Sequence, residues 1–472
     1  MAEIHFGTDG WRAIIGEDFT NDNLVRVIDA AARVFKEDAV AAGRPADAPG
    51  TLIVGHDCRQ DAHAYAQLAA EVAAAQSFRV LLTQDYCPTP TLCWSVAQNA
   101  DAVGGIMLTS SHNPAEYLGV KLRMSDGGAA GKEFTDRVEA AFSDAPTDAR
   151  GAFETVDLMT PYLATLKERV DVEAIRNANL RVVVDPLYGA GRIYLAELLR
   201  DLGVEVCEIN NAEDPTFDGL HPEPIPPWVD RCIAKVPELG YDAGFINDGD
   251  ADRIGAVDEH GNFVNPHRII TLLTSHLAED KGLTGRVVST ITASAMLARQ
   301  CKRLGLELTS TPVGFKWISS AMDEHNAVIG GESSGGLTVR GHIHGKDGIY
   351  AAALLVEMLS VTGKKLSELV ESIYERYGHC YMAEYDWPFD QEMKERLHKL
   401  IMIDKQLPEF PEKVESVSYM DGCKVRFADG WIIARFSGTE PRLRIFCEMP
   451  TKEKARDLAN LMARYLGLPE KE

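Results

Sequence analysis

The chain has 472 residues, 45% of them hydrophobic and 25% charged, and a net charge of −23 at pH 7. Its length predicts three or four domains, and its acidic balance disfavours nucleic acid and anionic membrane surfaces as partners. No run approaches the roughly 18 apolar residues of a membrane span, and the N-terminus lacks the basic and apolar segments of a signal peptide. Nine scattered cysteines without a C-x-x-C pair indicate a reducing compartment and argue against a disulfide frame or zinc site. We therefore expect a cytoplasmic protein.

The first three quarters of the chain repeat one strand–helix–strand pattern three times. In chain order we predict a strand at 51–55, a helix at 62–76 and strands at 78–82 and 102–107; a strand at 180–184, a helix at 194–202 and strands at 204–207 and 243–246; and a strand at 285–289, a helix at 293–304 and strands at 306–309 and 327–329. Strands that alternate with helices of this length indicate mixed, mainly parallel sheets covered on both faces. Three divergent copies of this size are duplicated domains rather than a solenoid.

The last part of the chain has a different pattern. An amphipathic helix at 366–377 ends the third copy, and strands at 422–427, 431–436 and 443–448 precede a helix at 452–466. We therefore predict an α/β protein with three duplicated α/β domains, mixed sheets and a C-terminal α+β domain. The predicted domain limits are 1–148, 149–262, 263–377 and 378–472.

A polar loop follows the last predicted strand of each copy, so three different loops occupy one equivalent position. In the second copy, Asp248, Asp250 and Asp252 alternate, so one turn can direct three carboxylates at a hard cation such as Mg²⁺ or Ca²⁺. Glu259, at the twelfth position, imitates an EF-hand, but Arg253 stands where that motif needs glycine and the preceding residues resemble a strand. A merely solvated acidic turn is the remaining alternative.

The equivalent loops of the other copies carry hydroxyls. Ser111 lies in a polar turn that could be an ordinary surface loop, but its position matches that of the acidic loop. A serine near a divalent cation and basic side chains is what a phosphoserine intermediate requires. In the third copy, Glu332 and Ser334 lie between glycines, which suits sugar hydroxyls or a flexible loop.

A fourth candidate segment lies near the C-terminus. Glycine lets backbone N–H groups approach an anion, hydroxyls donate to it, and arginine binds phosphate through two N–H groups. The alternative is a capped turn with a surface arginine. The residues of this candidate anion site are Arg435, Ser437, Gly438, Thr439 and Arg444.

Five segments together resemble the α-D-phosphohexomutase superfamily, which includes phosphoglucomutase and phosphomannomutase. They occur in the family's order and span essentially the whole chain: Phe6-Gly-Thr-Asp-Gly-Trp-Arg12, Ser111-His-Asn-Pro114, Asp248-Gly-Asp-Ala-Asp-Arg253, Gly331-Glu-Ser-Ser-Gly335 and Arg435-Phe-Ser-Gly-Thr-Glu-Pro441. The chain departs from the family pattern at Ala13, Leu118, Gly336 and Phe436. None of these differences removes a charged participant, but Gly336 leaves the subgroup open.

The resemblance implies four domains around a central cleft and reversible phosphoryl transfer between the 1- and 6-positions of a hexose phosphate. The transfer would pass through a phosphoserine and a hexose 1,6-bisphosphate, which also activates the enzyme. Ser111 would be the phosphoserine and, with Asp248, Asp250 and Asp252, would bind one Mg²⁺. The implied catalytic residues are Ser111, Arg12, His112, Lys121 and Arg253, and the implied substrate-binding residues are Glu332, Ser334, Lys346, Arg435, Ser437, Gly438, Thr439 and Arg444.

The segment His342-Ile-His-Gly-Lys-Asp-Gly348 resembles phosphoglucomutases, in which the lysine reaches the sugar. We therefore expect glucose 1-phosphate as the substrate, with a phosphomannomutase or a dual-specificity enzyme as the alternative. A phosphatase is disfavoured because a closed site excludes water, and a non-catalytic sugar-phosphate-binding protein is disfavoured by the intact serine and aspartates. The expected partners are small hexose phosphates, and the sequence carries no signal for an oligomeric state.

Overall fold

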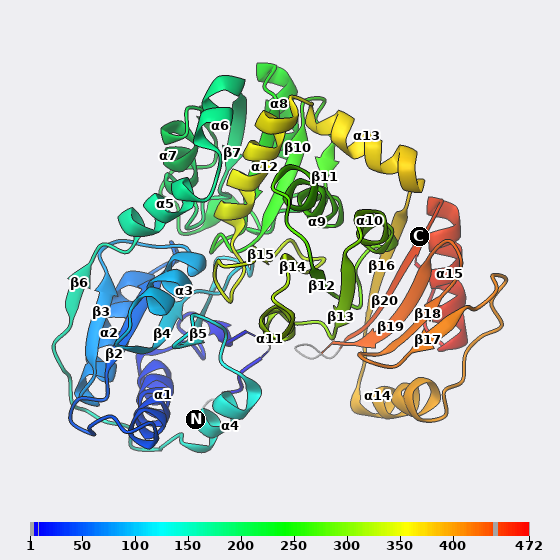
Figure 1. Cartoon of the computed structure of the whole chain (residues 1–472). Coiled ribbons are helices and arrows are strands. Elements are labelled where there is room, and N and C mark those ends of the chain that lie inside the picture. The colour runs from blue at the N-terminus through cyan, green and yellow to red at the C-terminus, as the bar shows by residue number, and fades with distance from the viewer. Residues whose placement is uncertain (1–3, 8, 438–441, 472) are drawn as a thin grey trace. The chain divides into compact units, whose positions relative to one another are not determined.

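The computed structural model describes residues 4–7, 9–437 and 442–471 (Figure 1). The chain forms two compact units. The first unit comprises the chain up to Ile269 together with Ser334–Glu368, and the second comprises Ile270–Ser333 and the chain from Leu369 onward. These units are larger than the predicted domains, whose limits therefore stay predictions.

The first sheet of the first unit has six strands in the order β1-β5-β4-β2-β3-β6. Strand β2 runs parallel to β3 and β4, and β5 runs antiparallel to β4 and β1. Two adjacent glycines show that both faces are covered, because neighbouring strand residues point to opposite faces. A Cβ on Gly104 would touch Phe35 of α1, whereas one on Gly105 would touch Val96 of α3. The elements are β1 (Trp11–Ile14), α1 (Asn21–Ala41), β2 (Thr51–His56), α2 (Ala62–Ala75), β3 (Arg79–Thr83), α3 (Thr89–Gln98), β4 (Ala102–Leu108), β5 (Tyr117–Met124), α4 (Lys132–Ala140) and β6 (Glu154–Val156).

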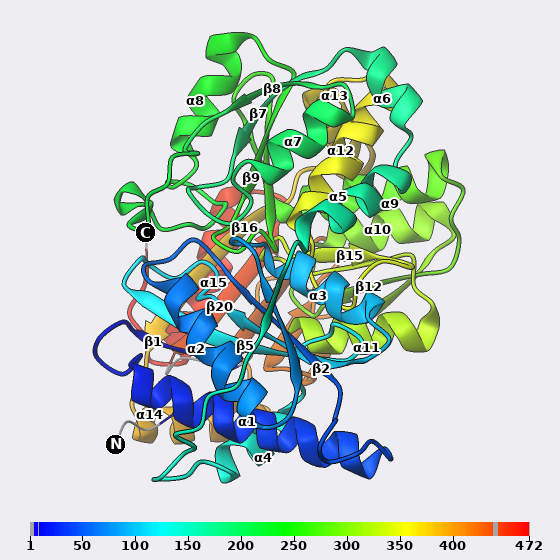
Figure 2. The same cartoon turned by 90° about the vertical axis from the view of Figure 1, so that its left-hand side faces the viewer.

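The second sheet of the first unit has the order β11-β10-β9-β7-β8. Strand β7 is parallel to β8 and β9, and β10 is antiparallel to β9. Helix α12 (Gly348–Thr362) comes much later in the sequence but packs on α6 and on strands β9 and β10 (Figures 1 and 2). The other elements are α5 (Met159–Glu168), α6 (Val172–Ala178), β7 (Arg181–Asp185), α7 (Tyr194–Asp201), β8 (Glu205–Glu208), α8 (Asp230–Leu239), β9 (Ala243–Asn247), β10 (Ile254–Asp258) and β11 (Phe263–Val264).

The third repeat contributes parallel strands to the second unit, where β12 pairs with β13 and β14. Its elements are α9 (Pro266–Ser275), β12 (Arg286–Thr290), α10 (Ala295–Leu304), β13 (Glu307–Thr311), α11 (Phe315–His325), β14 (Ile329–Gly331), β15 (Leu337–Val339) and α13 (Leu366–Tyr377). Strand β15 belongs to the first unit, and the ends of α9 and α13 fall in different units.

The C-terminal part of the second unit is an antiparallel sheet in the order β16-β20-β19-β18-β17. Helix α15 packs on it because Leu458, Ala459 and Met462 recur at helical spacing and are buried with the strand residues. The elements are β16 (Tyr381–Pro388), α14 (Gln391–His398), β17 (Ser416–Ser418), β18 (Cys423–Arg426), β19 (Trp431–Phe436), β20 (Arg442–Met449) and α15 (Lys452–Tyr465).

The predicted fold class is confirmed: three α/β repeats with mixed sheets precede an α+β domain. Strands β2, β7 and β12 have equivalent neighbours, so the three polar loops follow the equivalent strands β4, β9 and β14. The sequence patterns did not predict β16, α14 and β17 of the C-terminal domain, nor several elements of the repeats, among them α1, β5 and α12. Strand β16 does alternate, because Ala383, Tyr385 and Trp387 pack on the core and the charged Glu384 and Asp386 lie between them, so its period-two pattern was present in the sequence.

Candidate active site

The first polar loop holds Ser111 in an unusual backbone conformation. Its φ is +51°, in the left-handed region that side chains other than glycine seldom occupy. The backbone N–H of Ser111 donates to Thr109 Oγ1 at 2.9 Å, and its side-chain hydroxyl donates to Asp248 Oδ2 at 3.0 Å. His112 Nδ1 lies 3.4 Å from the same hydroxyl. The serine loop (residues 109–116) and the acidic loop therefore meet at the Ser111 oxygen.

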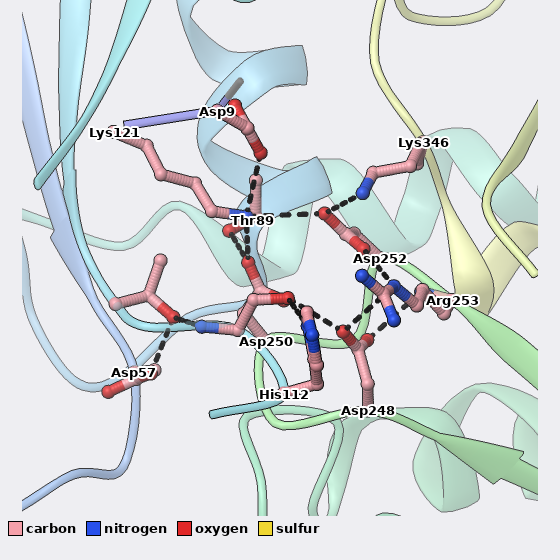
Figure 3. Close-up of polar contacts among 12 residues, drawn as sticks. Asp9, Asp57, Thr89, His112, Lys121, Asp248, Asp250, Asp252, Arg253 and Lys346 are labelled. Atoms are coloured by element: carbon pink, nitrogen blue, oxygen red, sulfur yellow. Dashed lines mark hydrogen bonds and ion pairs between the residues drawn. The ribbon is translucent and has the colours of Figure 1, made fainter. Parts of the chain in front are cut away.

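The acidic loop, residues 248–253, joins β9 to β10 and gathers its three carboxylates. Oxygens of Asp248, Asp250 and Asp252 lie within 4.8 Å of one another, and none of the three residues is more than 1% exposed. Asp250 accepts hydrogen bonds from Thr89 Oγ1 at 2.5 Å and from Lys121 Nζ at 2.7 Å (Figure 3). We call these three aspartates the carboxylate cluster.

The carboxylate cluster fits a divalent cation. The Oδ1 atoms of Asp250 and Asp252 are buried and have no hydrogen-bond partner, and an unsatisfied buried acceptor is costly. Burial, with the charges of Asp252 and Asp250, raises the pKa of Asp248 to about 8. A hard cation would supply the missing partner and would relieve this repulsion, because such ions prefer carboxylate oxygens.

Four basic side chains surround the carboxylate cluster. Lys121, on β5, is 1% exposed and pairs with Asp250, with Asp252 at 3.3 Å and with Asp9 at 3.1 Å. Burial by itself lowers the pKa of Lys121, but these carboxylates outweigh it and raise the pKa above its ordinary value. Lys121 is therefore a fixed cation and cannot serve as a base.

The two arginines of this group come from different elements, Arg12 from β1 and Arg253 from the end of the acidic loop. Arg253 Nη1 donates to Glu223 Oε1 at 2.9 Å, and its Nε lies 3.8 Å from Asp248 Oδ2. Arg12 Nη1 donates to Asn113 Oδ1 at 2.5 Å. Burial and the neighbouring charges of Arg253 and Arg12 hold the pKa of His112 well below its usual value, so this imidazole is neutral at pH 7.

Lys346 lies against the carboxylate cluster. Its Nζ is 3.1 Å from Asp252 Oδ2 (Figure 3). Its aliphatic chain crosses directly over Gly336. A Cβ at position 336 would lie 2.1 Å from the Lys346 Cδ, so a side chain there and this course of the lysine exclude each other. Glycine at position 336, one of the departures from the family pattern, is therefore required by the course of the Lys346 side chain.

The predicted sugar-binding residues follow β14. Glu332 and Ser334 are both half-buried, and the neighbouring Ser333 hydroxyl lies 3.2 Å from Thr292 Oγ1. Glu332 belongs to the second compact unit and Ser334 to the first. Their sugar-binding role stays a prediction.

The predicted anion site lies on the C-terminal sheet. Arg435 of β19 and Arg444 of β20 are directly opposite each other in the strand register, so both side chains lie on one face. Arg435 Nε donates to Asp421 Oδ2 at 2.8 Å, and Asp421 also accepts from the backbone N–H of Val313. Ser437 directly follows β19, whereas Gly438 and Thr439 lie outside the described residues.

Several residues of these sites were missed by the sequence analysis: Asp9, Asp57, Arg59, Thr89, Glu223 and Asp421. One signal was available. Asp57 and Arg59 directly follow β2, whose carboxyl end lies beside that of the parallel strand β4. Thr89 begins α3 directly after Pro88, and Glu223 lies in a proline-rich loop, so neither has a comparable local signature.

Family models match the chain along most of its length. The models are described as phosphoglucomutase/phosphomannomutase alpha/beta/alpha domain I at residues 3–148, domain II at 160–261, domain III at 265–377, and the C-terminal domain at 397–464. The chain belongs to the phosphoglucomutase/phosphomannomutase family. It is thus a phosphohexomutase, an isomerase of the α-D-phosphohexomutase superfamily.

Individual relatives carry different substrate names. The chain is 32% identical to a phosphoglucomutase/phosphomannomutase of Thermococcus kodakarensis, with 98% of both chains covered. It is also 32% identical to a probable phosphoglucosamine mutase of Methanopyrus kandleri, with 96% of both covered. Among solved structures, a putative phosphomannomutase of Thermus thermophilus matches with a TM-score of 0.86 and 33% identity over 99% of both chains. The family sets the reaction class but leaves the sugar open.

The free cysteines and the absence of a membrane-spanning helix in the described part of the chain bear on the expected cellular location. All nine cysteines are free, as the absence of a disulfide pattern predicted. Among the described residues, no helix is both long and apolar enough to cross a membrane. The cytoplasmic location stays a prediction.

Proposed function

We propose that this phosphohexomutase interconverts glucose 1-phosphate and glucose 6-phosphate through phosphorylated Ser111. The observation that carries the proposal is the hydrogen bond between Ser111 Oγ and Asp248, a member of the buried carboxylate cluster. A nucleophilic oxygen is thereby placed beside a candidate divalent-cation site and several fixed basic side chains. Phosphoryl transfer depends mainly on positioning and on charge stabilisation, which this arrangement supplies.

The reaction would proceed in two transfers. In the first, the bond between Ser111 Oγ and phosphorus breaks while the 6-hydroxyl oxygen of glucose 1-phosphate bonds to phosphorus, giving glucose 1,6-bisphosphate. In the second, after the bisphosphate turns over, the bond from O1 to phosphorus breaks and Ser111 is phosphorylated again. The proton lost by each attacking hydroxyl goes to a neighbouring base and returns to the leaving oxygen. His112, with Nδ1 3.4 Å from Ser111 Oγ, is the imidazole placed for such an exchange.

The basic side chains would neutralise the oxygens of the moving phosphoryl group. Lys121 and Arg253 already contact the carboxylate cluster, and Arg12 binds Asn113 of the serine loop. Asp248, Asp250 and Asp252, with the Ser111 oxygen, would hold one Mg²⁺. When bound, that ion supplies Lewis-acid stabilisation of phosphoryl charge.

The rest of the substrate would be held by the other predicted residues. The Arg435–Arg444 pair supports a role in holding the phosphate that is not reacting, because guanidinium groups on one face of the sheet attract an anion and bind phosphate through two N–H groups. The full proposed set for the sugar and this phosphate is Glu332, Ser334, Arg435, Ser437, Gly438, Thr439 and Arg444.

The preference for glucose rests on the resemblance of residues 342–348 to phosphoglucomutases. Lys346 Nζ lies against Asp252, next to the proposed position of the phosphoryl group. If this lysine also reaches the sugar, the ammonium of glucosamine 1-phosphate would lie beside a like charge. A dual-specificity enzyme is the second candidate, favoured by the name of the Thermococcus relative. The ordering we expect is glucose 1-phosphate first, then mannose 1-phosphate, then glucosamine 1-phosphate.

The test is to compare kcat/KM for the three sugar 1-phosphates at one fixed concentration of glucose 1,6-bisphosphate. A site that hydrogen-bonds a hydroxyl can reject a mismatched one strongly, whereas shape alone discriminates by about 10- to 200-fold. Equal values for glucose and mannose would establish dual specificity, and a higher value for glucosamine would replace the proposed substrate. Release of inorganic phosphate without the isomeric product would instead indicate a phosphatase.

A further inference from the structure

One buried arginine outside the predicted site binds the serine loop at several points. The side chain of Arg59 is fully buried and directly follows β2, next to Asp57. A guanidinium has five N–H donors in a rigid plane. All five of these donors are used here.

Four of the five donors reach backbone carbonyls of one short segment. Nη2 donates to the carbonyls of Ser111 and Asn113, both at 2.7 Å. Nη1 donates to the carbonyls of Pro114 at 2.6 Å and Tyr117 at 2.9 Å. One side chain thereby fixes the backbone from the nucleophile to the start of β5.

The fifth donor connects Arg59, through Asp57 and Thr109, to the backbone N–H of Ser111. Arg59 Nε donates to Asp57 Oδ2 at 3.1 Å, and the Thr109 hydroxyl donates to the same oxygen at 2.6 Å. Thr109 Oγ1 in turn accepts the backbone N–H of Ser111. Ser111 is therefore held through both its N–H and its carbonyl, which supports its left-handed backbone conformation.

The surroundings leave little room for an alternative course of the loop. The ring of Phe217 lies 5.0 Å from the guanidinium carbon and covers it. On the opposite loop, a Cβ at Gly249 would lie 2.3 Å from the Ser111 carbonyl oxygen. The acidic loop thus approaches the same carbonyl that Arg59 holds, and a shift of this carbonyl would disturb both loops.

We propose that Arg59, through Asp57 and Thr109, is the positioning residue that keeps Ser111 aligned for phosphoryl transfer. The inference rests on the proposed role of Ser111 as phosphoryl carrier. Arg59 touches no reacting atom, so its effect would be on the rate of transfer rather than on substrate binding. A displacement of about 1 Å at a reacting centre can reduce a rate by about 100-fold.

Two substitutions test the proposal, each with a matched control. Arg59→Lys keeps the positive charge, but three donors on one nitrogen cannot serve Asp57 and four separate carbonyls. Its control is Arg33→Lys, because Arg33 also pairs with an aspartate and donates to a backbone carbonyl, that of Ala141. Thr109→Val removes the hydroxyl that links Asp57 to Ser111, and Thr109→Ser restores it.

The measurements are the single-turnover rate of transfer from phosphorylated Ser111 to glucose 1-phosphate, the KM, and the melting temperature. We expect the transfer rate to fall at least about tenfold in Thr109→Val and further in Arg59→Lys, with KM changed by less than about threefold. Thr109→Ser and Arg33→Lys should remain within about threefold of the wild-type rate.

The outcomes separate this inference from the proposed function. If the wild-type protein neither takes phosphate on Ser111 nor interconverts hexose phosphates, the proposed function fails. If the wild type does both, and folded Thr109→Val transfers at the wild-type rate, the positioning role is wrong. The same conclusion follows if Arg59→Lys loses melting temperature but no transfer rate. If Arg59→Lys fails to fold, the comparison of Thr109→Val with Thr109→Ser tests the positioning role by itself.

Discussion

The carboxylate cluster and the Arg435–Arg444 pair are built in opposite ways. In the first compact unit, Lys121 shares three carboxylates and is almost fully buried, and Asp250 receives two side-chain donors. In the second unit, Arg435 and Arg444 face each other with like charge, and Arg435 is oriented by the single carboxylate of Asp421. A site with many mutual contacts can fix reacting atoms, whereas two arginines side by side on one face of a sheet suit the binding of an anionic ligand. Substitutions in the cluster should therefore change kcat, and substitutions at the arginine pair should change KM.

The largest effect is expected from Ser111→Ala, which removes the proposed phosphoryl carrier. Mutase turnover should fall on the order of 10⁴-fold or more, since the variant lacks the oxygen that carries the phosphoryl group in the proposed mechanism. The fold should persist, because the lost side chain is small. Ser110→Ala is the control, because Ser110 is the preceding residue and its hydroxyl is buried without a hydrogen-bond partner. Near-wild-type turnover in Ser111→Ala, measured in a coupled assay, would remove the serine from the mechanism.

The next largest effect is expected from Asp250→Asn. Loss of this charge removes a proposed cation ligand and the partner of Lys121, so kcat should fall by about 100-fold or more while substrate binding persists. A second readout is the melting temperature with and without MgCl₂, because a ligand that binds only the folded state stabilises it. The variant should gain less stability from Mg²⁺ than the wild type. An equal gain would place the ion elsewhere, and full activity with Ca²⁺ would contradict the choice of Mg²⁺.

Arg435→Ala tests the other half of the comparison. A charge-assisted phosphate contact contributes about 2–3 kcal/mol, so KM should rise by about 30- to 150-fold for both glucose 1-phosphate and glucose 6-phosphate. The same site must hold whichever phosphate is not reacting. Asp421→Asn, which leaves Arg435 in place but weakens its orientation, should raise KM less and with the same symmetry. A change for one isomer only would contradict the two-transfer scheme.

The smallest effect is expected from Gly336→Ala, which puts a methyl group on the path of the Lys346 side chain. Displacement of the lysine from Asp252 should lower kcat by about 3- to 10-fold. Gly345→Ala is the control, because a Cβ there meets no atom closer than the Cys93 Sγ at 3.3 Å. If the effect passes through the lysine, Gly336→Ala should change nothing further in a Lys346→Ala background. Additive losses in the double variant would show that the glycine acts by another route.

The sequence was sufficient where the signal is local. The alternating aspartates of the acidic loop predict a cation site by themselves, and the strand–helix alternation predicts the three repeated sheets. Lys121 has no such signature, since it lies within β5 like any strand residue. Only its antiparallel pairing with Met107 of β4 brings it to the carboxylate cluster. The family resemblance identified Lys121 as a catalytic residue, whereas residue spacing alone could not identify it.

Contacts between distant segments explain the remaining differences. Arg59 and Ser111 are separated by 52 positions in sequence, so the hydrogen bond from Arg59 to the Ser111 carbonyl depends on the parallel pairing of β2 with β4. The role of Lys346 at the sugar stays a prediction, and the position of its side chain beside Asp252 depends on the missing side chain of Gly336. The space that a glycine leaves for a distant side chain cannot be predicted from the sequence before the two residues are known to be neighbours.

The most direct test of the central claim is the fate of phosphate on Ser111. The purified protein is incubated with glucose 1,6-bisphosphate, and its intact mass and phosphorylated residue are determined before and after addition of glucose 1-phosphate. We predict one phosphate per chain, located on Ser111, that is lost to the sugar as bisphosphate forms, and no phosphate on the Ser111→Ala variant. Phosphate on another residue, or equal labelling of Ser111→Ala, would contradict the account.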